Sequence, residues 1–250
     1  MQVDLRDKVA LVTGSARRVG KVIALELARQ GVNILVHYHR AEPAEVRDTL
    51  QEIKSHGVDA CGVAADLSQA EGVETLFEAL QERFGRLDIV VNNASAFQRR
   101  DLLEVSLEDW DLTMAVNLRA PFLITQRAAR LMAKNPIPGG VIVNICDQGA
   151  DGPWKARPHH GVSKAALWSL TQVSALSLGP AIRVNAIVPG PIMKPAGREI
   201  SDEDWARKGA RSALHRTGQA EDVARAVVYL CREDYITGEL LHVNAGEHLP

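Results

Sequence analysis

The sequence predicts one α/β domain built on a doubly wound parallel sheet, and three observations support this prediction. Short runs rich in valine and isoleucine alternate with stretches of helical period along most of the chain. A Thr-Gly turn follows the first run and leads directly into a helical stretch. No linker rich in proline, glycine or serine divides the 250 residues, so a single domain over 1–250 is favoured. Alternating strands and helices imply right-handed crossovers and helices on both faces of the sheet.

The apolar runs are each about six residues long, which is typical of strands covered on both faces. They are Lys8–Thr13, Asn33–Tyr38, Ala60–Ala65, Leu87–Asn92, Gly140–Ile145 and Ala181–Ile187, with a last strand at about Leu240–Val243. The stretches between them are predicted to be helices at 18–30, 43–56, 69–85, 107–133 and 157–179. In the first of these, apolar side chains share one side of the helix, which indicates the face that packs on the sheet: Val19, Val22, Ile23 and Leu27.

Residues 190–213 interrupt the alternation of strands and helices. Pro189-Gly190-Pro191 is followed by Pro195, Gly197 and a short polar stretch of helical pattern. Irregular segments beyond the carboxyl ends of parallel strands commonly cover a ligand. We therefore expect a substrate lid near 191–213.

Composition narrows the range of partners. The 29 basic and 31 acidic residues give a net charge of -2, which favours neither a nucleic-acid surface nor a membrane surface. Cys61, Cys146 and Cys231 are few, odd in number and widely spaced, as expected in a reducing cytoplasm. No metal site is expected, because the adjacent His159 and His160 would point about 100° apart on a helix.

The first turn carries the pattern of a dinucleotide site. Thr13-Gly14-Ser15-Ala16-Arg17-Arg18-Val19-Gly20 joins the first strand to the first helix. Glycines in such a turn let the backbone approach a pyrophosphate, and the start of the helix offers free N–H groups. Gly14 and Gly20 are therefore predicted to bind a dinucleotide.

Further motifs stand in order along the chain, and with the glycine turn they make it resemble the short-chain dehydrogenase/reductase family over its whole length. They are Ala65-Asp66-Leu67, Asn92-Asn93-Ala94, Asn117, Lys164, Arg183-Val184-Asn185 and Pro189-Gly190. The resemblance implies a Rossmann-type fold and a nicotinamide dinucleotide bound by Gly14, Gly20, Asp66, Asn92, Ala94, Lys164, Pro189 and Gly190. It implies that Asp66 contacts the adenine, that Asn92 stabilises the central sheet and that Asn117 holds a water in the active site.

Two departures from the usual family pattern resemble the pteridine reductase branch. Arg18 replaces the middle glycine of the turn. The second strand ends in His37-Tyr38-His39-Arg40, with no acid before Glu42. An acid at this place would bind the ribose 2′-hydroxyl of NAD, whereas a cation suits the 2′-phosphate of NADP. We expect His39 and Arg40 to select NADP(H).

The reaction centre lacks the usual proton donor of the family, a tyrosine four residues before the lysine. His160 stands there, four residues before Lys164, and Tyr38, Tyr229 and Tyr235 all lie elsewhere. Asp147, thirteen residues before His160, occupies the place of the family serine, as in pteridine reductases. The expected catalytic set is Asp147, His160, Lys164 and Asn117. In it Asp147 relays the proton, His160 orients the substrate or a water, and Lys164 positions the ribose.

The leading hypothesis is an NADPH-dependent reductase of a pterin-like heterocycle. The resemblance implies that Arg18, Ser95, Phe97 and Asp147 hold the substrate, with the phenyl ring stacked on a flat bicycle. One alternative is a carbonyl/alcohol oxidoreductase in which His160 acts as the acid. Another is a catalytically silent NADP(H)-binding sensor. The resemblance also implies a homotetramer formed through the helices at 107–133 and 157–179.

Overall fold

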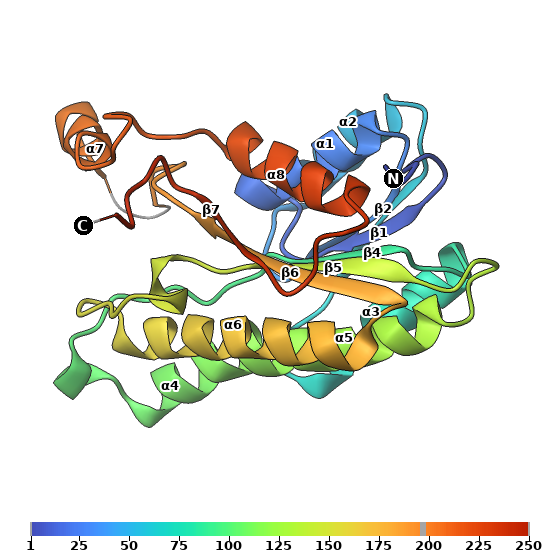
Figure 1. Cartoon of the computed structure of the whole chain (residues 1–250), viewed down its shortest axis with the longest axis horizontal. Helices are drawn as coiled ribbons and strands as arrows, with labels where there is room; N and C mark the ends of the chain where they lie inside the picture. The colour runs from blue at the N-terminus through green and yellow to red at the C-terminus, as the bar shows by residue number, and fades with distance from the viewer. Residues whose placement is uncertain (1, 196–198, 250) are drawn as a thin grey trace.

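The computed structural model describes residues 2–195 and 199–249 and confirms the α/β fold (Figure 1). In this described part, seven strands form one sheet in the order β3-β2-β1-β4-β5-β6-β7, and every neighbouring pair is parallel. The strands are β1 (Val9–Val12), β2 (Asn33–Tyr38), β3 (Ala60–Ala64), β4 (Ile89–Asn92), β5 (Gly140–Ile145), β6 (Ile182–Pro189) and β7 (Leu240–Val243). All of them fall within or close to the predicted runs.

Helices cover both faces of the sheet, as Figure 1 shows. On one face lie α1 (Arg18–Arg29), α2 (Pro43–Lys54) and α8 (Ala220–Arg232). On the other lie α3 (Ala70–Arg83), α4 (Leu107–Met114), α5 (Ala120–Met132) and α6 (Pro158–Leu178). Across the described ranges, no helix is both long and apolar enough to span a membrane.

The strands are apolar throughout because both of their faces are covered. In β1, Ala10 and Val12 pack in the core under α1 and α8. Their neighbours Val9 and Leu11 pack in the core under α3 and α5. Since side chains alternate between the two faces of a strand, an unbroken apolar run is what a sheet between two helical layers requires.

The predicted helix at 107–133 is present, but it changes its winding in the middle. A five-residue π-helical stretch, Ala115–Arg119, joins α4 to α5. It lies just before Pro121, which has no N–H to donate to the carbonyl oxygen four residues earlier, that of Asn117. Wide turns of this kind are frequent at functional sites. Here the turn carries Asn117.

The C-terminal third differs most from the sequence prediction. Helix α8 was not predicted, although its apolar positions recur with helical spacing and its buried residues include Val223 and Val227. In the expected lid, α7 (Asp202–Gly209) is the predicted short polar helix. Residues 196–198, including Gly197, lie outside the described residues.

The strand order determines where a ligand-binding crevice is expected. Strand β1 lies between β2 and β4, so the connections turn one way from β1 to β3 and the other way from β4 onwards. At such a switch point the loops diverge and leave a crevice beyond the carboxyl ends of the strands, where ligands bind. The glycine turn after β1 and the Asn93-Ala94-Ser95 segment after β4 meet there.

Candidate active site

The glycine turn is shaped by close approach of the backbone. Gly14 has a φ of +65°, and a side chain at Gly20 would bring its Cβ within 2.2 Å of the Gly14 carbonyl oxygen. The same Cβ would lie 2.6 Å from the Asn93 amide nitrogen. Only glycine fits such a position without strain. The turn therefore brings backbone N–H groups up to the crevice.

Side chains from neighbouring strands fix this turn. The Thr13 hydroxyl accepts hydrogen bonds from the backbone N–H groups of Asn93 and Ala94, both at 2.9 Å. The Asn93 amide donates to the carbonyl oxygen of Thr13 at 2.8 Å. His37 Nδ1 accepts from the Gly14 N–H at 3.0 Å, and its Nε2 lies 3.1 Å from the Ala65 carbonyl oxygen. Burial lowers the pKa of His37 to about 4, so its imidazole is neutral at pH 7 and acts as a fixed spacer.

Arg18 has a backbone conformation that glycine adopts more readily. Its φ is +56°, in the left-handed region that side chains rarely adopt. Its guanidinium donates to the carbonyl oxygen of Lys194 at 2.7 Å. The residue thus ties the glycine turn to the segment that leads into the expected lid.

A cleft of about 1780 Å³ runs along the carboxyl edge of the sheet from this turn. It is lined by the predicted cofactor residues Gly14, Arg18, Gly20, His39, Arg40, Asp66 and Ala94, and also by Ser95. Nε2 of His39 lies 3.8 Å from a carboxylate oxygen of Asp66. Burial acts to raise the pKa of Asp66, but hydrogen bonds from Ser68 and the charges of His39 and Arg40 outweigh it and lower that pKa.

The donor set of this cleft fits a nicotinamide dinucleotide. Within the described residues, the side chain of Arg17, which precedes α1, does not cap the helix, so the first N–H groups of α1 can meet a phosphate. The two glycines leave room for the pyrophosphate, and Arg40 lines the end of the cleft where an adenosine ribose would lie. These features match the chemistry of the group.

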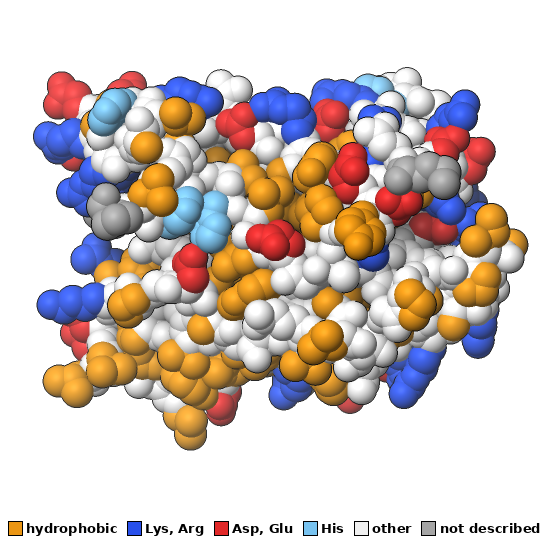
Figure 2. Space-filling view, viewed as in Figure 1, with side chains coloured by type: hydrophobic (Ala, Val, Ile, Leu, Met, Phe, Trp, Pro, Cys, Tyr) orange, Lys and Arg blue, Asp and Glu red, His pale blue; other side chains and the backbone are white. Residues whose placement is uncertain are grey.

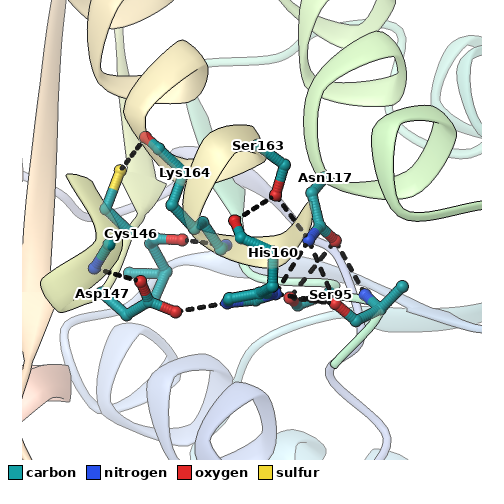
Figure 3. Close-up of polar contacts among 10 residues, drawn as sticks. Ser95, Asn117, Cys146, Asp147, His160, Ser163 and Lys164 are labelled. Carbon is teal, nitrogen blue, oxygen red and sulfur yellow. Dashed lines mark hydrogen bonds and ion pairs between the residues drawn. The ribbon is translucent and has the colours of Figure 1, made fainter. Parts of the chain in front are cut away.

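The structure also brings Asp147, His160, Lys164 and Asn117 together (Figure 3). Asp147 follows β5, and His160 lies in the first turn of α6. Nε2 of His160 forms a short contact with one carboxylate oxygen of Asp147. The other carboxylate oxygen accepts the backbone N–H of Gly149 at 2.8 Å. A Cβ on Gly149 would lie 2.7 Å from Gly161, so the two glycines allow this close packing.

The far side of the His160 ring faces two different partners. Nδ1 lies 2.9 Å from the carbonyl oxygen of Ala96 and 3.1 Å from the amide nitrogen of Asn117. A carbonyl oxygen only accepts and an amide nitrogen only donates. His160 therefore finds a partner for Nδ1 whether or not that atom carries a proton, while Nε2–H donates to Asp147.

Charge at the centre is concentrated on Asp147 and Lys164. Burial acts to raise the pKa of Asp147, but the hydrogen bond from His160 and the charges of His160 and Lys164 outweigh it and leave this pKa below its ordinary value. Lys164 is buried, and its Nζ donates to the carbonyl oxygen of Ile145 at 2.7 Å. The side chain of Asp147 is 19% exposed and that of His160 only 1%, so Asp147 is the member of the pair that an incoming substrate can reach.

Aromatic side chains close the centre on its outer side. Phe97 lies edge-on to His160, with ring centroids 4.8 Å apart, and Trp154 lies 6.0 Å from the same ring. The guanidinium of Arg157 lies 4.1 Å from the centroid of Phe97. Sequence analysis singled out Phe97 but missed Trp154 and Arg157. One feature of the sequence could have pointed to these two residues: both lie between Asp147 and His160 in the chain.

The remaining residues near the site contact neighbouring strands, helices or loops. The Asn92 amide donates to the Asn144 side chain at 2.8 Å and links β4 to β5. Ser163 was also missed; its hydroxyl accepts from Asn117 at 3.0 Å. Pro189 ends β6, and a Cβ on Gly190 would lie 2.8 Å from Asn244.

Comparisons with known proteins find relatives that match almost the whole chain. Residues 14–248 match the family described as enoyl-(acyl carrier protein) reductase. Glucose 1-dehydrogenase 2 of Bacillus subtilis is 36% identical, with 98% of this chain and 96% of the relative covered. A 3-oxoacyl-(acyl-carrier-protein) reductase of Aquifex aeolicus is also 36% identical, with 98% and 99% covered. A blue fluorescent protein from a metagenomic library, solved with NADPH, has a TM-score of 0.89 at 33% identity, with 98% and 99% covered.

Proposed function

Because the chain belongs to the short-chain dehydrogenase/reductase family, we propose that it is an NADPH-dependent reductase of a pterin-like heterocycle. Membership of the family makes it an oxidoreductase that binds a nicotinamide dinucleotide. The observation that carries the finer proposal is the contact between Asp147 and His160, at the positions where the resemblance to the family implies serine and tyrosine. The aromatic rings of Phe97 and Trp154 beside this pair suit a flat substrate.

The choice of NADPH is supported by two basic side chains that line the cleft. His39 and Arg40 both line it, and Asp66 already faces His39. A 2′-phosphate adds negative charge that a guanidinium binds through charge-assisted hydrogen bonds. One structural neighbour was solved with NADPH, which agrees with this choice. Fluorescence titration should therefore give tighter binding of NADPH than of NADH, and equal affinities would contradict the proposal.

Asp147 is proposed to pass the proton to the substrate. Bound NADPH supplies a hydride to the imine carbon. The carboxylate of Asp147 is the more exposed member of the pair, so a proton taken up from solvent can pass through this carboxylate to the imine nitrogen while His160 holds the carboxylate in place. An imine nitrogen is more basic than a carbonyl oxygen and demands less of its acid. The absence of a tyrosine beside Lys164 is therefore less damaging for this substrate class than for ketones.

Carbonyl/alcohol chemistry is the second candidate, because the names of two relatives describe a glucose dehydrogenase and a 3-oxoacyl reductase. If His160 were the direct acid, its Nε2 would have to leave Asp147 and reach the substrate from a buried position. A silent NADP(H)-binding protein is the third candidate and predicts cofactor binding without turnover.

A substrate panel separates the three candidates. NADPH oxidation is followed with dihydrobiopterin, dihydrofolate and a set of simple ketones and 3-oxoacyl thioesters. The proposed function predicts turnover of the dihydropterins well above that of every carbonyl compound. Faster turnover of the carbonyl compounds would favour the second candidate, and NADPH binding without any turnover would favour the third.

We further propose that the protein assembles as a homotetramer in the cytoplasm. Apolar side chains are exposed along α4 and α6, with Leu107 75% and Leu176 86% exposed. Figure 2 shows hydrophobic side chains gathered at the lower left, over α4 and the turn before it. Apolar surface of this extent favours burial against another copy. Light scattering after size-exclusion chromatography should give four times the mass of 27.2 kDa, and a monomer would contradict the assembly.

A further inference from the structure

A second groove lies beside the cofactor cleft, between the end of β2 and helix α2. Its volume is about 530 Å³, which is a size typical of small-molecule pockets. Tyr38 and Ala41 line both this groove and the cofactor cleft, so the groove adjoins the segment that carries His39 and Arg40. The rest of its lining is one stripe of α2 at helical spacing: Pro43, Val46, Arg47, Leu50, Gln51 and Lys54.

The inner side of the groove is apolar. Val46 is buried, and Leu50 and Tyr38 are partly buried against the same core cluster. Gly62 on β3 adjoins all three, because a Cβ there would lie 3.2 Å from Val46, 3.2 Å from Leu50 and 3.5 Å from Tyr38. Strand β3 is the edge of the sheet, so no further strand covers these side chains. The glycine therefore leaves them room to take an apolar ligand.

Helix α2 carries two charged stripes, and the acidic one has partners. Glu45 and Glu52 stand seven residues apart, which places them on one side of the helix. Glu45 lies 3.6 Å from the guanidinium of Arg17, and Glu52 lies 2.8 Å from the ammonium of Lys21. The acids of α2 are thus paired towards α1.

The basic stripe, Arg47 and Lys54, is also spaced by seven residues but lines the groove. Arg47 lies 4.0 Å from its exposed neighbour Asp48, a separation at which a surface pair contributes little. Within the described ranges, Lys54 forms no ion pair. Its charge reaches Asp59, but that carboxylate is already paired with Arg83 at 2.7 Å. The rim of the groove therefore offers two cations to a negatively charged group.

We propose that this groove binds a medium-chain carboxylate, an amphiphile with an apolar chain and one anionic head. The chain lies along Val46, Leu50 and Tyr38, and the carboxylate meets Arg47 and Lys54 at the rim. A carboxylate forms charge-assisted hydrogen bonds with both cations, which a neutral head group cannot do. The site is separate from the reaction at Asp147, so it stands or falls independently of the proposed function.

Calorimetric titration with octanoate, decanoate and octanamide tests both parts of the proposal. Octanoate should bind about fivefold tighter than octanamide, because only the carboxylate uses the two cations. Decanoate should bind about tenfold tighter than octanoate, since it buries two more methylene groups. Equal affinities for octanoate and octanamide, or for octanoate and decanoate, would overturn the proposal.

A double variant locates the anionic head. Arg47→Gln with Lys54→Gln should remove the preference for octanoate and leave octanamide binding unchanged. The matched control is Arg130→Gln with Lys134→Gln, which removes two exposed cations from the other face of the sheet and should keep the preference. An equal loss in the control would show that net charge alone attracts the anion, and would contradict the site.

A variant of β3 locates the chain. Gly62→Val should press on Val46, Leu50 and Tyr38 and weaken octanoate and octanamide alike by about tenfold or more. NADPH affinity should stay unchanged and serves as the check of folding. Should Gly62→Val lose NADPH binding, Gly62→Ala makes the smaller change and should weaken both probes several-fold. Wild-type affinity for both probes in a folded Gly62 variant would overturn the proposal.

Discussion

Two buried histidines, one at each end of the carboxyl edge of the sheet, make different contacts with the same kind of side chain. His37 and His160 are 2% and 1% exposed. His37 lies between the Gly14 N–H and the Ala65 carbonyl oxygen, and burial lowers its pKa to about 4. His160 meets the Asp147 carboxylate, and its second nitrogen has both an acceptor and a donor within reach. Equally buried histidines therefore make different contacts: His37 joins two backbone groups, and His160 joins the Asp147 carboxylate to Ala96 and Asn117.

The same contrast holds for the two ends of the site as wholes. At the cofactor end, backbone geometry dominates, since Gly14, Gly20 and Thr13 shape the turn through close approach and backbone hydrogen bonds. At the reaction end, side-chain contacts dominate, above all the contact between Asp147 and His160. Because Asp147 and His160 contact each other, a substitution of either residue should disturb the other.

The cofactor end is tested most strongly by Arg40→Asp. The change removes a cation from the adenosine end of the cleft and adds a repulsive charge. We expect NADPH affinity to fall by about 100-fold or more, with little change for NADH. Fluorescence titration with both cofactors measures the effect. Arg47→Asp, an exposed position on α2, is the matched control, and an equal loss there would mean that net charge alone is responsible.

His37 should make stability depend on pH. Its pKa falls from 6.5 in the unfolded chain to about 4 in the folded protein, so the unfolded state binds the proton more readily. The contribution is complete above pH 6.5 and is lost as the pH falls towards 4. Between pH 7 and pH 5 the free energy of unfolding should drop by about 2 kcal/mol through this group.

Urea denaturation at the two pH values checks this drop. His37→Asn should reduce the difference between pH 7 and pH 5, whereas His56→Asn, at an exposed position, should leave it as in the wild type. An unchanged pH dependence in His37→Asn would show that another group is responsible.

The smallest effect is expected at Arg18. Glycine there should relieve the left-handed backbone and raise the free energy of unfolding by about 1 kcal/mol. It should also weaken NADPH binding, because a cation leaves the turn. Arg17→Gly is the control, since Arg17 has an extended backbone with φ -155° and should be destabilised by glycine. Equal stability changes in the two variants, measured by urea denaturation, would contradict the strain at Arg18.

Much of the fold could be predicted because strands between two helical layers must be apolar throughout. The runs around Val9–Val12 and Ile89–Asn92 are visible for this reason. Helix α8 was not predicted, although its apolar spacing is regular. The π-helical stretch around Asn117 was not predicted, since it depends on how the helix accommodates Pro121.

In the site, motif spacing predicted which residues come together but not how. Asp147 and His160 are thirteen residues apart, and the sequence did not reveal that one nitrogen of the ring would be occupied by the carboxylate. The stack of Arg157 on Phe97 and Trp154 depends on the course of the loop after β5. Contacts between side chains on irregular segments have no periodicity from which they could be read.

The most direct test of the account is single-turnover oxidation of NADPH with dihydrobiopterin, measured by stopped flow in wild type and Asp147→Asn. Asparagine keeps the shape of the side chain and removes the group that passes the proton, so the rate should fall by about 10²-fold or more while NADPH affinity stays unchanged. Asp151→Asn is the control with a nearby carboxylate, and His160→Gln should lose less than Asp147→Asn. Equal rates in wild type and Asp147→Asn would show that the proton comes from elsewhere and would contradict the account.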